Sequence, residues 1–111
     1  MFKLTVLILL VSGPIQAHAL SQSDICEHAA IVAGFAFHSR ASGTSEIDVK
    51  EIVSVVFPTD GYAESASLAE RVIENVYSLP ESQIENMKPI DKEAMEAIEI
   101  GTFRRCIDDQ W

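Results

Sequence analysis

The residues of this chain best suited to chemistry are a thiol, a carboxylate and an imidazole in one run, Cys26-Glu27-His28. Sulfur, oxygen and imidazole nitrogen all serve as metal ligands, so such a cluster could hold an ion such as zinc. The surrounding sequence favours a helix, however, and residues i and i+2 of a helix do not face each other. The next histidine, His38, is ten residues further on. It is therefore turned about 80° away from a common face with His28. We expect no metal site here.

A row of carboxylates, Glu93, Glu96 and Glu99, is the second group that could act chemically. A pair of carboxylates can perform acid–base catalysis when burial raises the pKa of one of them. These three recur opposite the apolar rows of a helix, so we interpret them as one solvated acidic strip. They are candidate contacts for a partner, and we assign them no catalytic role.

Catalytic motifs are missing from the sequence. It contains no nucleophile elbow, zinc-protease helix, phosphate-binding loop or glycine fingerprint, and its serines have no recognisable base partner. We expect neither enzyme activity nor a cofactor. Tyr62 and Trp111 are two further candidate contact residues, because aromatic side chains are enriched at interfaces. For Trp111 two alternatives to a partner contact remain open: its side chain packs back onto the domain as a plug, or it stays loose.

The elements that carry these residues follow an amino-terminal segment typical of an export signal. It has a positive start at Lys3, an uncharged apolar run over residues 4–12, a break at Gly13-Pro14, and a small-x-small site at Ala17-His18-Ala19. The apolar run is shorter than the roughly 20 residues that cross a bilayer. We predict that residues 1–19 are a cleaved signal peptide. Residues 20–111 are then a single soluble domain, periplasmic or secreted.

The two cysteines, Cys26 and Cys106, both lie in the predicted mature part. An even number of cysteines in a small exported domain favours a disulfide, here closing a loop of about 80 residues. The chain-entropy model assigns such a loop roughly 4.5 kcal/mol of stabilisation. The alternative is a reactive thiol pair, but redox motifs usually place their cysteines close together, as in Cys-x-x-Cys.

Hydrophobic spacing predicts four helical segments, over residues 23–42, 45–56, 62–78 and 91–108. The first has the wide apolar face of a central helix. Residues 52–57 are mostly β-branched, so a strand remains the alternative there. Residues 80–90 are undecided, apart from a short helical turn at 82–87. We predict an all-α fold, a small up-down bundle of about four helices closed by one disulfide, because its topology brings both cysteines to the same pole.

The net charge of the chain limits the classes of partner that it can attract. Loss of Lys3 with the signal leaves 7 basic residues against 17 acidic ones, a net charge of −10. Nucleic acids and anionic lipids both attract basic surfaces, so we expect neither as a partner. The acidity either keeps the surface solvated or attracts a basic protein.

The mature chain resembles a loose group of small exported proteobacterial proteins of unknown function. The likeness rests on the early and late cysteines, on Arg40-Ala41-Ser42-Gly43-Thr44-Ser45, and on Val76-Tyr77-Ser78-Leu79-Pro80. It implies a disulfide-closed helical domain and no particular activity. Our leading hypothesis is a non-catalytic exported module that binds or neutralises a basic protein, such as a toxin. The alternatives are an acid-stress periplasmic chaperone and a small-ligand carrier with a cavity between helices.

Overall fold

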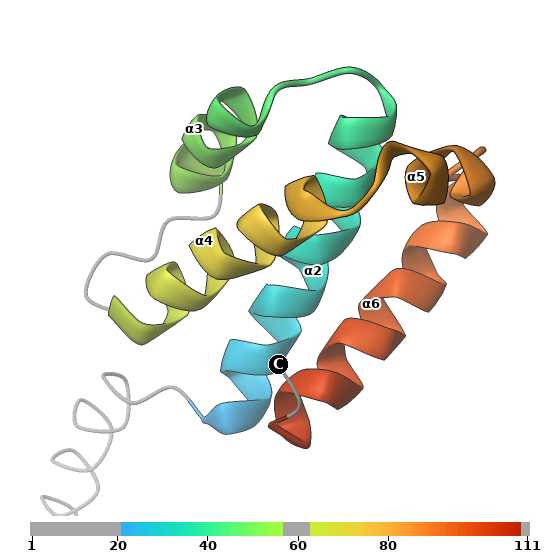
Figure 1. The fold of residues 1–111 in the computed structure, drawn as a ribbon. Coiled ribbons are helices and arrows are strands. Elements are labelled where there is room, and N and C mark those ends of the chain that lie inside the picture. Colours follow the sequence, from blue (N-terminus) through green and yellow to red (C-terminus); the bar gives the residue numbers. More distant parts are fainter. Residues whose placement is uncertain (1–20, 57–62, 110–111) are drawn as a thin grey trace, which may run out of the picture.

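The computed structural model describes residues 21–56 and 63–109, and these form five helices (Figure 1). In chain order they are α2 (Gln22–Ala41), α3 (Glu46–Val56), α4 (Ala63–Ser78), α5 (Glu81–Met87) and α6 (Lys92–Ile107). The predicted all-α fold, an up-down bundle closed by one disulfide, is confirmed. The strand alternative is wrong over the described residues 52–56, which are helical in α3. The undecided stretch contains α5.

Helix α2 is the centre of the domain because its small residues let other helices approach on several sides. Ser21 caps its first turn, accepting a hydrogen bond from the backbone N–H of Asp24 at 3.1 Å. The chain leaves the helix through Gly43, whose φ of +92° is a conformation that favours glycine. α6 and α4 both pack extensively on α2, whereas α3 packs mainly on α4. The buried small residues of α2 are Ala29, Ala30, Ala33, Gly34 and Ala36.

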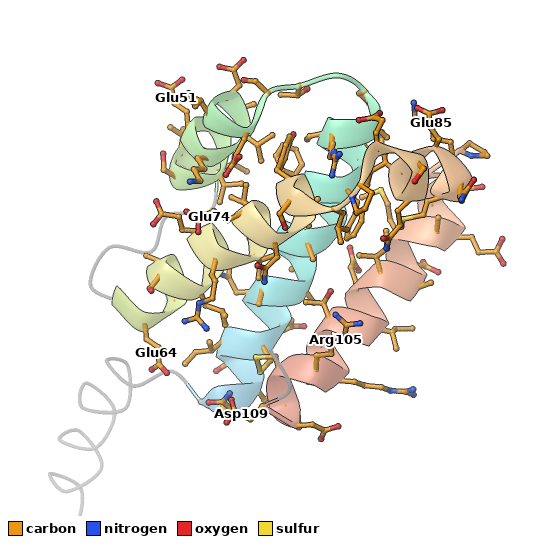
Figure 2. All side chains as sticks on the ribbon, in the orientation of Figure 1. Glu51, Glu64, Glu74, Glu85, Arg105 and Asp109 are labelled. Carbon is orange, nitrogen blue, oxygen red and sulfur yellow. A yellow bond between two sulfur atoms is a disulfide. The ribbon has the colours of Figure 1, made fainter. Side chains whose placement is uncertain are left out.

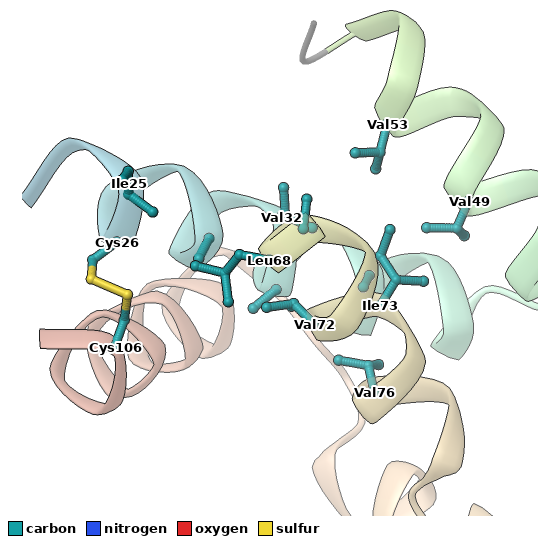
Figure 3. Close-up of a cluster of buried hydrophobic side chains, with 14 residues drawn as sticks. Ile25, Cys26, Val32, Val49, Val53, Leu68, Val72, Ile73, Val76 and Cys106 are labelled. Carbon is teal, nitrogen blue, oxygen red and sulfur yellow. A yellow bond between two sulfur atoms is a disulfide. The ribbon is translucent and has the colours of Figure 1, made fainter. Parts of the chain in front are cut away.

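The apolar core lies where α4 crosses α2 and meets α3 (Figure 3). Ile73 of α4, Val32 of α2 and Val49 of α3 are all essentially inaccessible to solvent. Burying a side chain of this size contributes about 1.5–3 kcal/mol, so these contacts hold the three helices together. At the edge of the core, the Nζ of Lys50 lies 2.9 Å from the carboxylate of Glu74, which adds an ion pair between α3 and α4.

Helix α6 is attached in a different way. Only Cys106 of this helix is fully buried, while Ile98 and Phe103 are partly buried against the core. Cys106 forms a disulfide with Cys26, with 5.4 Å between the Cα atoms and a sequence separation of 80. One cysteine lies near the start of α2 and the other near the end of α6, so the two helices run antiparallel (Figure 1). The disulfide is therefore the best-buried attachment of α6 to the domain.

The other pole of the domain is closed by polar contacts around the end of α2. The Nη1 of Arg40 donates to the carbonyl oxygen of Val76 at 2.7 Å, and the hydroxyl of Tyr77 donates to the carbonyl oxygen of Thr44 at 2.6 Å. Burial raises the pKa of the Tyr77 hydroxyl, so the group stays protonated as a donor. The Nη2 of Arg40 also lies 3.4 Å from Oε1 of Glu81 in α5, and Ile84 of the same helix is fully buried. These contacts fix where α4 ends and α5 begins.

Candidate functional site

The predicted acidic strip of α6 is divided in the structure. Glu93 and Glu96 are exposed, but Glu99 is half-buried at the contact with α2. The reason is geometric, since three residues turn a helix by about 300° and a row with this spacing drifts by about 60° at each step. Two steps carry the row from solvent onto the helix interface. The interpretation of all three carboxylates as one solvated strip is therefore wrong at Glu99.

Glu99 lies directly over Gly34 of α2. A Cβ atom placed on Gly34 would be 3.1 Å from Oε2 of Glu99 and 3.3 Å from its Cγ. The absence of a side chain at position 34 thus leaves room for the stem of the glutamate to lie against the backbone of α2. This packing places a carboxylate in the middle of the α2–α6 seam.

Exposed apolar side chains flank Glu99 along this seam. Ile31 of α2 is 40% exposed and Ile100 of α6 is 55% exposed. Two shallow hollows of about 330 and 400 Å³ follow one another along the seam and share Glu99. We call this surface the α2–α6 face, defined by the residues that line the two hollows. They are Glu27, Ala30, Ile31, His38, Ile90, Asp91, Lys92, Met95, Glu96, Glu99, Ile100, Phe103 and Arg104.

The α2–α6 face is net acidic. Two cations, Lys92 and Arg104, stand against four carboxylates. The exposed Glu93 adds a further negative charge on the same helix. An apolar stripe with an acidic rim is complementary to an apolar segment with basic flanks. The four carboxylates are those of Glu27, Asp91, Glu96 and Glu99.

The run Cys26-Glu27-His28 is spread over three environments. Cys26 is in the disulfide, Glu27 is exposed on the α2–α6 face, and the ring of His28 points to α4. The run therefore does not form a ligand cluster. In the ranges 21–56 and 63–109, no group of three or more His, Cys, Asp or Glu side chains could hold a metal ion.

A serine–histidine pair was missed by sequence reasoning. The hydroxyl of Ser65 lies 3.0 Å from Nδ1 of His28, so the statement that no serine has a base partner is wrong. Burial lowers the pKa of His28, which favours the neutral ring. Ser65 is itself only 3% exposed, so a substrate has no open path to its hydroxyl. The pair acts as a polar link between α2 and α4, and the signal for it was that both residues fall on apolar helix faces.

The remaining predicted sites lie outside the described residues. These are the signal peptide at residues 1–19, Tyr62 and Trp111. Among the helices that the structure describes, none has the length and apolar character needed to cross a membrane. Comparison with protein families, characterised proteins and solved structures gives no significant match to this chain.

Proposed function

We propose that the mature chain is an exported, non-catalytic module that binds a basic protein partner through the α2–α6 face. The observation that carries this proposal is the exposed pair Ile31 and Ile100 in shallow hollows with a net acidic rim. Contiguous exposed apolar surface rimmed by polar groups is typical of protein interaction sites. The fitting partner is a segment with aliphatic or aromatic anchors flanked by lysine or arginine.

Export is part of the same proposal, to the periplasm or beyond the cell. The predicted signal at residues 1–19 supports it, and so does the Cys26–Cys106 disulfide. Disulfides of this kind persist in oxidising compartments and are rare in the cytosol. The module therefore meets its partner outside the cytoplasm.

A toxin is one class of partner that suits this chemistry. A toxin that acts on nucleic acids or anionic membranes needs a basic surface to reach them. An acidic module of net charge −10 that covers such a surface blocks access to the target. Neutralisation then requires only tight docking and no catalysis, which agrees with a site built from apolar and carboxylate side chains.

The test uses a matched pair of charge-introducing variants and periplasmic extract from the native host. Ile100→Lys disrupts the α2–α6 face, whereas Ile47→Lys changes the same residue type on α3, where the side chain is 77% exposed. We expect the wild-type chain and Ile47→Lys to retain the same partner and Ile100→Lys to lose it. Association of the purified partner should slow markedly as salt rises, because exposed charges are screened over about 8 Å at physiological ionic strength.

Charge reversal provides the second arm. Glu27→Lys combined with Glu96→Lys should weaken binding, while the control pair Glu51→Lys with Glu64→Lys, on α3 and α4, should change it little. A partner that keeps its affinity in Ile100→Lys and in the first charge-reversal pair would show that the α2–α6 face is not the docking surface.

The acid-stress chaperone is a second candidate, and one observation favours it. Protonation of half-buried His28 would loosen the contact between α2 and α4 in acid and expose core side chains. Against it, the mature chain keeps only Lys50, Lys88 and Lys92, whereas such chaperones are rich in lysine. Suppression of client aggregation below about pH 4, with no partner at neutral pH, would favour this function over the first.

A further inference from the structure

A separate hollow of about 150 Å³ lies where α4 and α6 meet over α2. We propose that this hollow binds a small monocarboxylate with a short apolar tail, held at its carboxylate by Arg105. None of its lining residues belongs to the α2–α6 face, so the site stands independently of the function proposed above.

The floor of the hollow is apolar and well packed. Ala33 of α2 and Val72 and Val76 of α4 form it, and each is less than 5% exposed. Phe37 and Leu79, both half-buried, extend this apolar surface. An apolar ligand tail that packs on this floor is transferred from water to a preformed apolar surface. Little conformational entropy of the protein is therefore lost on binding.

Two polar groups, Arg105 of α6 and Asn75 of α4, line the same hollow. Figure 2 shows the Arg105 side chain extending from α6 toward the space beside α2 and α4. In the described part of the chain Arg105 has no ion pair, as is also true of Arg71, Lys92 and Arg104, whereas Arg40, Lys50 and Lys88 each contact a carboxylate. Arg105 is the one cationic side chain that lines this hollow, and its exposed guanidinium is free to bind an anion at the rim.

The chemistry of these groups selects a carboxylate. A guanidinium binds a carboxylate through two parallel N–H···O hydrogen bonds, and the amide of Asn75 can donate a third. A cationic headgroup would be repelled by Arg105, and an uncharged one would lose the bidentate contact.

The positions of the lining residues also set the orientation in which a ligand would bind. Arg105 is adjacent to Cys106, while Phe37 lies eleven positions beyond Cys26 on α2. The disulfide places the two cysteines side by side, so Arg105 lies level with the start of α2. Phe37 lies about three turns, or about 16 Å, further along the α2 axis. A bound carboxylate at Arg105 would therefore direct its tail over Val72 toward Phe37.

The volume sets the size of the tail. An enclosed apolar cavity of about 150 Å³ accepts one benzene molecule. The present hollow has a similar volume but is open to solvent on one side, so one ring fits on its floor with its outer face in water. The ligand class is thus a monocarboxylate with a phenyl ring or a branched chain of similar bulk, and phenylacetate is a suitable probe. A long fatty acid exceeds the hollow, and acetate leaves its floor uncovered.

The experiment titrates the oxidised mature chain with phenylacetate, acetate and 2-phenylethylammonium, followed by calorimetry and by amide chemical shifts. We expect saturable phenylacetate binding with a Kd on the order of 1 mM, typical of a ligand this small. The largest shifts should fall at Ala33, Asn75 and Thr102. Acetate and 2-phenylethylammonium should bind at least tenfold more weakly.

Neighbouring arginines on the same helix give a matched control. Arg105→Leu should weaken phenylacetate binding at least tenfold, whereas Arg104→Leu, which removes the same charge from the α2–α6 face, should change it less than twofold. Thr102→Phe should fill the hollow and abolish binding while helical circular dichroism persists.

Three binding results would overturn the assignment, and one chemical-shift result would do the same. The binding results are no saturation by phenylacetate up to about ten times the expected Kd, equal losses in Arg104→Leu and Arg105→Leu, or equal binding of the 2-phenylethylammonium cation. Chemical shifts confined to Ile31 and Ile100 would also exclude this hollow.

Discussion

Removing the disulfide is the sharpest test of how this domain is held together. The perturbation is the double variant Cys26→Ala with Cys106→Ala, which removes two buried sulfur atoms and leaves methyl side chains. The native bond spans 80 positions, and a cross-link of that length removes roughly 4.5 kcal/mol of chain entropy from the unfolded state. Against a typical total of 5–15 kcal/mol, we expect the variant to lose roughly 30% or more of its free energy of unfolding.

The structure also predicts which helix is destabilised most when the disulfide is removed. α6 has no fully buried residue other than Cys106, whereas α2, α3 and α4 share a core that includes Val32, Val49 and Ile73. In the double variant, amide protons of α6 should therefore lose more of their protection against exchange than those of α4.

The assay is urea unfolding followed by circular dichroism, with linear extrapolation to water. Reduced wild-type protein with blocked thiols serves as the control, because it lacks the bond and keeps both cysteines. If the double variant and the reduced protein each lose less than about 1 kcal/mol, the entropy argument fails for this chain. If α6 and α4 lose protection together, the idea of a separately attached helix is wrong.

Three other predictions test single features of the fold. Burial lowers the pKa of His28, so the unfolded state binds more protons below about pH 6.5 and stability falls as pH drops through that value; His28→Asn should flatten this part of a stability–pH curve. Gly34→Ala should change the free energy of unfolding by less than about 1 kcal/mol, because a gain in helix propensity offsets a small displacement of the flexible Glu99 side chain. Gly34→Leu should lower the free energy of unfolding by about 1–3 kcal/mol in the same urea assay. Protein from the native host should begin at Leu20 by amino-terminal sequencing, and a cytosolic product that starts at Met1 would contradict export.

Local chemistry made much of the fold predictable. Ser21 and Asp91 have side chains that accept hydrogen bonds from backbone N–H groups in the first turns of α2 and α6, and both caps are visible in the sequence. Two observations favoured a helix over a strand at residues 49–53. The apolar residues have helical spacing, and an isolated strand would lack a partner. The pairing of Cys26 with Cys106 followed from their number and from the antiparallel order of the helices.

The candidate sites could not be predicted in the same way because they depend on how helices pack. The burial of Glu99 requires knowing that Gly34 lies opposite it. The row's drift of about 60° at each step follows from its spacing of three residues, but the spacing does not show which side of α6 packs on α2. The contact between His28 and Ser65 joins residues 37 positions apart. The hollow beside Arg105 needs three helices in place, and no pattern within one helix encodes it.

Both proposed sites are built by the placement of α6 against α2. The α2–α6 face lies on one side of that contact, and the hollow beside Arg105 lies on the other. α6 packs along α2 but has Cys106 as its one fully buried residue, so reduction should destabilise α6 and disrupt both sites, while the core of α2, α3 and α4 remains. Reduced protein should then keep the protection of its α4 amides but lose phenylacetate and the basic partner together. Under the two proposals, such a chain would acquire its binding surfaces only after oxidation, and export to an oxidising compartment would be a condition for binding.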